Sequence, residues 1–434
     1  MGEAEPTPDA GVHVGPVGAL RLYGWTDRAV VAAALMALAS GFGQYGVVAA
    51  LGDVSKQLGH LAPGATIADK VGLSGTDLGI GLAIIRLASL ASLPIVGTAD
   101  RLGRRRVIIV CTIVGLALTA AAAGSPGYWW FVAIFALGRP LLSATNAIAQ
   151  VMGAEETAAK DRAAAVALIA AGYAVGAGLS AIVHSLASGS LGFRGIFALA
   201  AVPLVGVVLL RRWVEEPSRF SVEEYAAEHP TPVLGAVSAP YGGRVVCLAL
   251  AAFALSIVTG PANSYVFLYA QDVLHMAGWV MAVMVVVSGA CGFAGLLVGR
   301  WSADHFGRRF TCSLGLVAIA LSAAFAYSGT KGALFAGYTF GVISGAILAP
   351  GAGSLLTELF PTSVRASVAG WWVVAGVVGA GLGLVAFGAV ADVGNRFAEA
   401  ADITFLPTVI AAALFWFVPE TKGKEPEDLW PSSP

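Results

Sequence analysis

The sequence predicts an all-α integral membrane protein with twelve transmembrane helices in two related six-helix halves. The first observation is composition, because 57% of the 434 residues are hydrophobic and only 12% are charged. A soluble domain usually carries about a quarter charged residues, and the mean hydropathy here is +0.80. The second observation is a series of twelve apolar runs, and the third is a repeat that relates the two halves of the chain. We therefore expect lipid to be the solvent for much of the chain.

The apolar runs are long enough to cross a bilayer, which takes about 20 predominantly apolar residues. The N-terminal half, residues 29–213, has six runs, at 29–51, 78–98, 107–124, 128–151, 163–187 and 193–213. The C-terminal half, residues 244–418, has six more, at 244–270, 278–299, 310–328, 332–356, 366–391 and 401–418. Residues 214–243, with five glutamates and four prolines, are predicted to form a polar linker.

The loops differ in charge on the two sides of the predicted membrane. If the N-terminus is cytoplasmic, eighteen Lys and Arg residues lie on its side and five on the other. Such an excess is typical of cytoplasmic loops. Residues 1–28 also have no basic segment leading into a signal-peptide core. We therefore expect cytoplasmic tails at 1–28 and 419–434 and a multi-pass protein of the cell membrane.

Two loops repeat the same residues at the same position in each half. Residues 99–105 read Ala-Asp-Arg-Leu-Gly-Arg-Arg, and residues 303–309 read Ala-Asp-His-Phe-Gly-Arg-Arg, at an offset of 204. Glu155 and Arg162 recur as Glu358 and Arg365 at an offset of 203. The agreement of these offsets predicts two parallel repeats, as transporter folds often contain.

These motifs resemble the major facilitator superfamily over almost the whole chain. The family motif follows the second span as Gly, then Asp-Arg-x-Gly-Arg-Arg, and its copy follows the eighth span with His305 in place of the usual Arg. Gly138-Arg139 and the terminal box Pro419-Glu420-Thr421-Lys422-Gly423 are similar to the sugar-porter branch of the family. Two departures put sugar and a first-span proton carrier in doubt. Residues 260–265 lack that branch's Gln-Gln pair, and residues 40–46 lack an Asp.

The resemblance implies a network of charges and turn glycines that changes between conformations. A tight turn between spans suits glycine, and acidic groups at a helix N-terminus are stabilised there. The alternative is a basic turn that only fixes topology. The predicted gating residues are Asp100, Arg101, Gly103, Arg104, Arg105, Asp304, Gly307, Arg308, Arg309, Glu155, Arg162, Glu358, Arg365, Glu216 and Glu420.

Two arginines lie inside predicted spans, where charge is costly and is usually functional. Arg86 precedes Asp100 by 14 residues, and Arg139 precedes Glu155 by 16. At 1.5 Å per residue they lie roughly 21 Å and 24 Å from the cytoplasmic face. No acid of comparable depth appears in the spans. An arginine pairs well with a carboxylate, so we expect an organic anion; the alternative is a structural or snorkelling arginine.

Other polar and aromatic side chains in the spans are candidates for the cavity wall. The full set of predicted substrate-binding residues is Arg86, Arg139, Gln44, Tyr45, Asn146, Gln150, Tyr173, Asn263, Tyr265, Tyr269 and Trp372. His184, near the outer end of the fifth span, is interpreted either as a surface histidine or as a proton-linked group.

The resemblance and the two arginines together predict a secondary active transporter. We expect it to move a small organic anion by alternating access, in symport with protons, as a monomer. No nucleotide-binding loop of the Gly-x-x-x-x-Gly-Lys-Ser/Thr type is present. We expect no enzyme activity, no cofactor, no metal site and no nucleic-acid binding. A sugar or polyol porter and a proton-antiport exporter of amphipathic compounds are the alternatives.

Overall fold

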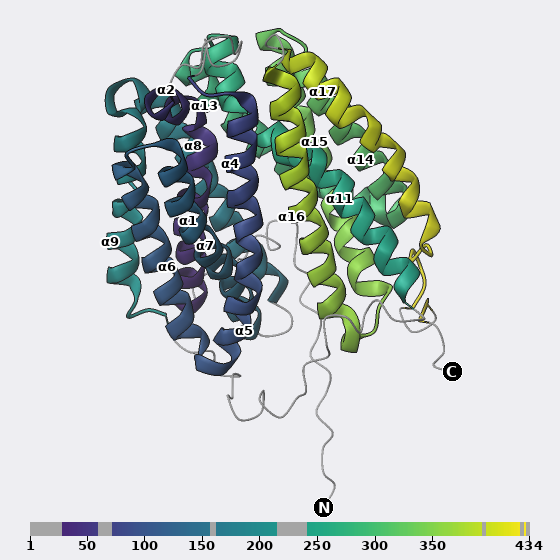
Figure 1. The fold of residues 1–434 in the computed structure, drawn as a ribbon. Helices are drawn as coiled ribbons and strands as arrows, with labels where there is room; N and C mark the ends of the chain where they lie inside the picture. The colour runs from purple at the N-terminus through teal and green to yellow at the C-terminus, as the bar shows by residue number, and fades with distance from the viewer. Residues whose placement is uncertain are drawn as a thin grey trace, which may run out of the picture.

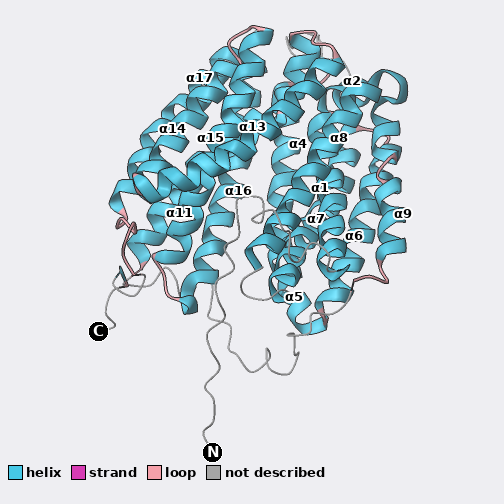
Figure 2. Ribbon diagram, turned by 180° about the vertical axis from the view of Figure 1, so that it is seen from behind, coloured by secondary structure: helices cyan, strands magenta, loops and turns pink. Residues whose placement is uncertain are grey.

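The computed structural model describes residues 28–59, 72–156, 162–214, 241–392, 396–425 and 429–430. Helices and loops make up this part of the chain, which contains no strand (Figure 2). In the described residues, twelve helical segments are long and apolar enough to cross a membrane. The all-α membrane fold with twelve spans is thus confirmed, while the linker at 215–240, which includes Glu216, lies outside the described residues.

Each half contains six of these spans (Figure 1). The N-terminal half consists of α1 (Arg28–Ala49), α2 (Leu51–Leu58), α4 (Gly75–Ala88), η2 (Ser89–Ala91), α5 (Ser92–Leu102), α6 (Arg104–Ala121), η3 (Ala122–Gly124), α7 (Tyr128–Glu156), α8 (Arg162–Ala198) and α9 (Ala201–Leu210). The C-terminal half consists of α11 (Gly242–Ser264), α12 (Val266–Leu268), η5 (Tyr269–Val273), α13 (Gly278–His305), α14 (Arg308–Ala326), α15 (Lys331–Glu358), α16 (Thr362–Asp392), α17 (Phe397–Phe405) and η6 (Leu406–Phe417).

The two ends of the bundle differ in which loops they carry. We call the end at which α1 begins and η6 ends the basic end, because it holds the arginine-rich turns before α6 and α14. The opposite end is called the distal end. In both ribbon views α4 and α16 lie side by side, whereas α5, which continues α4 toward the basic end, stands apart from α16 (Figures 1 and 2).

The repeat found in the sequence has the same backbone conformation in both halves. Gly103 precedes α6 with φ 91° and ψ 132°, and Gly307 precedes α14 with φ 102° and ψ 158°. A residue with a Cβ is strained at such positive φ angles. The tight turn therefore requires glycine at both positions.

Small residues bring two helices of each half into close contact. A Cβ added at Gly176 of α8 would lie 1.9 Å from the Leu38 carbonyl oxygen of α1. In the other half, a Cβ at Gly379 of α16 would lie 2.2 Å from the Phe253 carbonyl oxygen of α11. Small residues permit such backbone contact between helices in lipid. The first and fifth spans thus pack as the seventh and eleventh do.

Several spans are interrupted where a proline removes a backbone donor. The second span changes from α4 to the 3₁₀ turn η2 at Ser89, five residues before Pro94. The seventh span contains Pro261 and then breaks into α12 and the π-helical turn η5. Irregular backbone inside a span often occurs near a binding site.

Candidate functional site

A small cavity of about 60 Å³ lies between the two halves and contains both intramembrane arginines. Its walls include Arg86, Arg139, Tyr45 and Tyr173 from the N-terminal half and Ser264 and Leu384 from the C-terminal half. Arg86 is eleven residues after Gly75, the first residue of α4, and Arg139 is eleven residues after Tyr128, the first residue of α7. Both therefore lie roughly 16 Å along their helices from the distal end.

Arg139 is held in place by the first span. Its Nη1 donates a hydrogen bond to the Gln44 carbonyl oxygen at 2.9 Å, and the residue is only 8% exposed. Its buried Nε has no hydrogen-bond partner in the described part of the chain. This arginine is therefore oriented by the protein and keeps a donor unused.

Gln44 supports Arg139 but does not line the cavity. The side chain is buried, and its Nε2 donates to Ser40 Oγ at 2.8 Å while its Oε1 accepts from Ser143 Oγ at 3.2 Å. Its amide therefore ties α1 to α7, next to the arginine.

Arg86 is half-buried and is the less constrained of the two arginines. Among the described residues, none accepts a hydrogen bond from its guanidinium group. No acidic side chain of the described part of the chain lines the cavity either. Two permanent positive charges in one partly desolvated space make this site electropositive.

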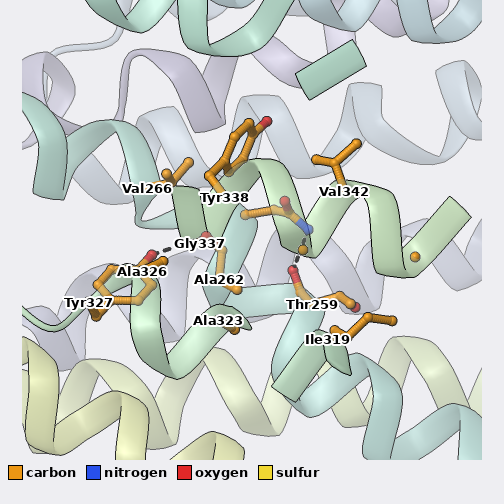
Figure 3. A pocket seen from close by; sticks show the side chains of 13 residues that line it. Thr259, Ala262, Val266, Ile319, Ala323, Ala326, Tyr327, Gly337, Tyr338 and Val342 are labelled. Carbon is orange, nitrogen blue, oxygen red and sulfur yellow. Dashed lines mark hydrogen bonds between the residues drawn. The ribbon is translucent and has the colours of Figure 1, made fainter. Parts of the chain in front are cut away.

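A second cavity, of about 180 Å³, lies within the C-terminal half (Figure 3). Asn263 lines it together with Tyr338, which the sequence analysis did not single out. Tyr45 of the arginine cavity lies close to Tyr338, so the two cavities are neighbours. Tyr338 was missed because the tenth span has no motif near it; its only signal was a phenol in the middle of an apolar run.

The other predicted cavity residues lie elsewhere. Asn146 and Gln150 are half-buried on α7 and line neither cavity. Trp372 is half-buried and packs against the main hydrophobic core. Tyr265 and Tyr269 are 1% and 2% exposed and belong to an aromatic cluster with Phe387 and Phe397.

At the distal end, the halves are joined by the carboxylate of Asp392. It accepts hydrogen bonds from the backbone N–H groups of Gly75 and Thr76, the latter at 2.7 Å, and from Thr76 Oγ1 at 2.6 Å. Gly75 and Thr76 begin α4, so an acidic group from α16 caps a helix N-terminus of the other half. Tyr265 Oη adds a hydrogen bond to the Gly75 carbonyl oxygen at 3.2 Å.

A second distal contact surrounds His184, which is fully buried. Its Nε2 lies 2.9 Å from Asp53 Oδ2, and its Nδ1 lies 3.5 Å from Gln271 Nε2 of the other half. Next to it, Lys56 forms a salt bridge with Asp272 across the halves. His184 is therefore not a surface histidine.

At the basic end, the predicted charge network is present within the C-terminal half. Arg308 lies 3.4 Å from Asp304 and 3.5 Å from Glu358. Arg365 Nη2 donates to the Phe360 carbonyl oxygen at 3.2 Å. These contacts join α13, α14, α15 and the start of α16. In this conformation the network holds one half together.

Glu420 caps α14 in the same network. Its carboxylate accepts hydrogen bonds from the backbone N–H groups of Arg308, Arg309, Thr421 and Lys422 at 2.9 to 3.1 Å. Burial favours a higher pKa for this carboxyl, but the four donors outweigh it and hold the pKa below its usual value. Arg309 lies over the Trp416 ring at 4.9 Å.

The N-terminal copy of the network is described only in part. Arg105 Nε donates to the Val214 carbonyl oxygen at 2.6 Å, Arg104 is 3% exposed, and Arg101 is exposed. The side chains of Asp100, Glu155 and Arg162 lie outside the described part of the structure. Their pairing stays a prediction.

Comparison with known proteins places this arrangement among membrane transporters. The family model described as Major Facilitator Superfamily matches residues 33–326 and 277–432. The cis,cis-muconate transport protein of Acinetobacter baylyi is 25% identical over 338 residues, which cover 74% of this chain and 80% of that protein.

Solved structures share the fold at low sequence identity. The xylose transporter XylE from E. coli, in an inward-open conformation, has a TM-score of 0.72 at 19% identity and covers 92% of this chain and 98% of its own. The nucleoside transporter NupG has a TM-score of 0.72 at 15% identity over 89% of this chain and 98% of its own. The chain is a transporter, not an enzyme, and belongs to the Major Facilitator Superfamily.

Proposed function

We propose that this protein is a secondary active transporter that moves a small organic anion across the cell membrane, in symport with protons. The observation that carries the proposal is the cavity that is lined by both Arg86 and Arg139 and, among the residues that the structure describes, by no acidic side chain. Each guanidinium presents donors in a planar fork that matches a carboxylate. A bound anion would supply the acceptors that the Arg139 Nε and the Arg86 guanidinium lack among the described residues.

The sequence relative supports an anionic substrate. The Acinetobacter baylyi protein is named for transport of muconate, an organic anion, and it aligns with most of this chain. The likeness to the xylose and nucleoside transporters reflects the common fold, because identity is below one fifth.

Alternating access gives the two ends of the bundle their roles. Asp392 and the Lys56–Asp272 pair join the halves at the distal end, on the far side of the arginines from the basic end. If the basic end faces the cytoplasm, as the excess of Lys and Arg predicts, this conformation is closed to the outside. Transport then requires these distal contacts to break while contacts form at the basic end.

The His184–Asp53 contact is our candidate for the proton-linked group. Histidine is a common proton carrier in proteins, and this one lies beside a carboxylate. Because His184 also faces Gln271 of the other half, its charge would affect how the halves meet. The His184→Gln variant should exchange substrate across the membrane but lose stimulation by a proton gradient.

The test is uptake into proteoliposomes of labelled organic anions, xylose and a cationic dye, with and without an inward proton gradient. We expect anion uptake that rises with the gradient and is lost in Arg86→Gln. Uptake of xylose or dye that does not depend on Arg86 would contradict the proposal and favour a sugar porter or an exporter.

A further inference from the structure

The cavity in the C-terminal half is suited to an apolar group. Its walls include Ala262, Val266, Ile319, Ala323 and Val342, whose side chains surround the space in Figure 3. Within the described ranges of the chain, no charged side chain lines it. Apolar walls of this kind favour apolar ligand atoms over water.

The polar groups on the wall are already engaged in part by the protein. Asn263 Nδ2 donates to the Thr259 carbonyl oxygen at 2.9 Å, and Tyr327 Oη donates to the Ala262 carbonyl oxygen at 3.0 Å. The cavity therefore offers few free donors to a sugar hydroxyl. A polyhydroxy ligand would lose hydrogen bonds to water without regaining them.

The apolar cavity and the arginine cavity are neighbours. Asn263 lines the first and Ser264, the next residue, lines the second. Tyr45 of the arginine cavity lies close to Tyr338 of the apolar cavity. One elongated molecule can thus reach both spaces if this tyrosine pair separates.

We propose that the substrate is an amphipathic monocarboxylate whose charged head binds Arg86 and Arg139 and whose apolar body occupies the C-terminal cavity. This inference rests on the proposed anion transport and narrows its substrate class. The volume of about 180 Å³ sets the size of the body, because an apolar cavity of about 150 Å³ is known to accept benzene. The body is therefore about one six-membered ring, aromatic or saturated.

This arrangement also explains how substrate can bring the halves together. The head is bound by α4 and α7 of one half, and the body is bound by α11, α14 and α15 of the other. A ligand that contacts both halves favours the conformation in which they approach. Tyr338 lies between the two binding regions and determines which ligands pass from one to the other.

The inference is tested by calorimetric binding to the purified full-length protein in lipid nanodiscs. The probes are acetate, benzoate, cyclohexanecarboxylate, 2-naphthoate and the neutral benzamide. We expect the two single-ring acids to bind about tenfold or more tighter than acetate, because apolar burial is favourable. The naphthoate should bind more weakly than benzoate because of its second ring, and benzamide should not bind.

Two variants fill the apolar cavity from positions with free space. A Cβ at Gly341 has only Ser322 Cβ nearby, at 3.9 Å, and a Cβ at Gly345 has nothing within 4 Å. Gly341→Leu and Gly345→Leu should each weaken single-ring acids about tenfold or more while acetate binding is unchanged. Size-exclusion chromatography shows which variant folds, and either one suffices for the test.

The two proposals fail in different ways. Equal binding of acetate and benzoate, or ring-acid binding that neither leucine variant changes, overturns the two-part site but leaves anion transport intact. Absence of binding by every acid, or equal binding of benzamide and benzoate, overturns the proposed anion transport itself.

Discussion

Arg86 and Arg139 lie at the same depth of the N-terminal half, each eleven residues from the distal start of its helix, and both line one cavity. The preceding spans, α1 before α4 and α6 before α7, run from the basic to the distal end. Both α4 and α7 therefore run from the distal to the basic end, and equal spacing from their first residues gives the two arginines a similar depth. The pair places two positive charges on the wall of one cavity.

Arg86→Gln should weaken binding of an anionic substrate roughly tenfold to a hundredfold, since a hydrogen bond to a charged group contributes about 1.5–3 kcal/mol. Arg86→Lys should lie between Gln and the wild type, because it keeps the charge but not the planar fork. The measurement is the substrate Kd by calorimetry. The control is Arg396→Gln, since Arg396 is exposed at the distal end and pairs with Glu399. Equal losses in Arg86→Gln and the control would contradict a role in the cavity.

Arg139→Gln should lower both substrate affinity and thermal stability. Arg139 binds the Gln44 carbonyl oxygen, so the variant loses a contact between α7 and α1 that is independent of substrate. We expect a loss of about 1.5–3 kcal/mol from this contact, seen as a lower Tm in detergent without substrate. Because Arg86 has no such protein partner among the described residues, Arg86→Gln should leave the Tm unchanged. A lower Tm in Arg86→Gln as well would contradict this division of roles.

Asp392→Ala should shift the protein toward a conformation open at the distal end. The change removes three hydrogen bonds to Gly75 and Thr76, and loss of about 1.5–3 kcal/mol for even one changes the ratio of conformations about tenfold or more. The shift is measured as the distance between spin labels in Pro126→Cys and Gly332→Cys, introduced after replacement of the four native cysteines. Pro126 and Gly332 are exposed at the distal ends of the two halves.

The control for this measurement is Asp402→Asn, which changes an exposed acid on α17. An unchanged distance distribution in Asp392→Ala would show that Asp392 does not hold the distal end closed.

Much of the fold follows from the sequence because membrane spans depend on local composition. The runs of apolar residues predicted all twelve spans, and the repeated Gly103 and Gly307 predicted two turns of the same shape. Each of these features depends on residues close together in the chain. Lipid requires long apolar helices, and a tight turn at positive φ requires glycine.

Which face of a span meets the cavity could not be predicted in the same way. Arg86 and Arg139 stand out because charge is rare in the spans, but Tyr265 and Tyr269 were selected only as polar groups in an apolar run. Both pack in the aromatic cluster with Phe387 of α16 and Phe397 of α17. The contact of Asp392 with Gly75 joins residues 317 apart, and no local pattern indicates it.

Glu420→Gln should destabilise the protein at neutral pH but not in acid. The pKa of Glu420 is held below its usual value of 4.5: burial acts to raise it, but the four backbone donors prevail. Because the folded state binds this proton less readily than the unfolded state, the stabilisation is present above pH 4.5. It is lost as the pH falls through the lower pKa of the folded state.

The measurement is the difference in Tm between wild type and Glu420→Gln as a function of pH. A helix cap is worth about 0.5–2 kcal/mol, and partial exposure of this carboxylate places the effect at the lower end. The difference should be constant from about pH 7 to pH 5 and should then narrow. A difference that grows in acid would contradict the cap.

Gly307→Ala should destabilise the protein more than Gly329→Ala, although both glycines have a φ of 102°. A residue with a Cβ is strained at this φ, at a cost of about 1–3 kcal/mol. At Gly329 a Cβ has nothing within 4 Å, whereas at Gly307 it would lie 2.7 Å from Glu420 Oε2. Only Gly307→Ala must therefore displace the carboxylate that caps α14. The difference in Tm between the two variants should narrow when both are made in Glu420→Gln, because the weakened cap has less to lose. An equal Tm for Gly307→Ala and Gly329→Ala in the wild-type background would show that Glu420 stabilises this turn by less than the measurement resolves.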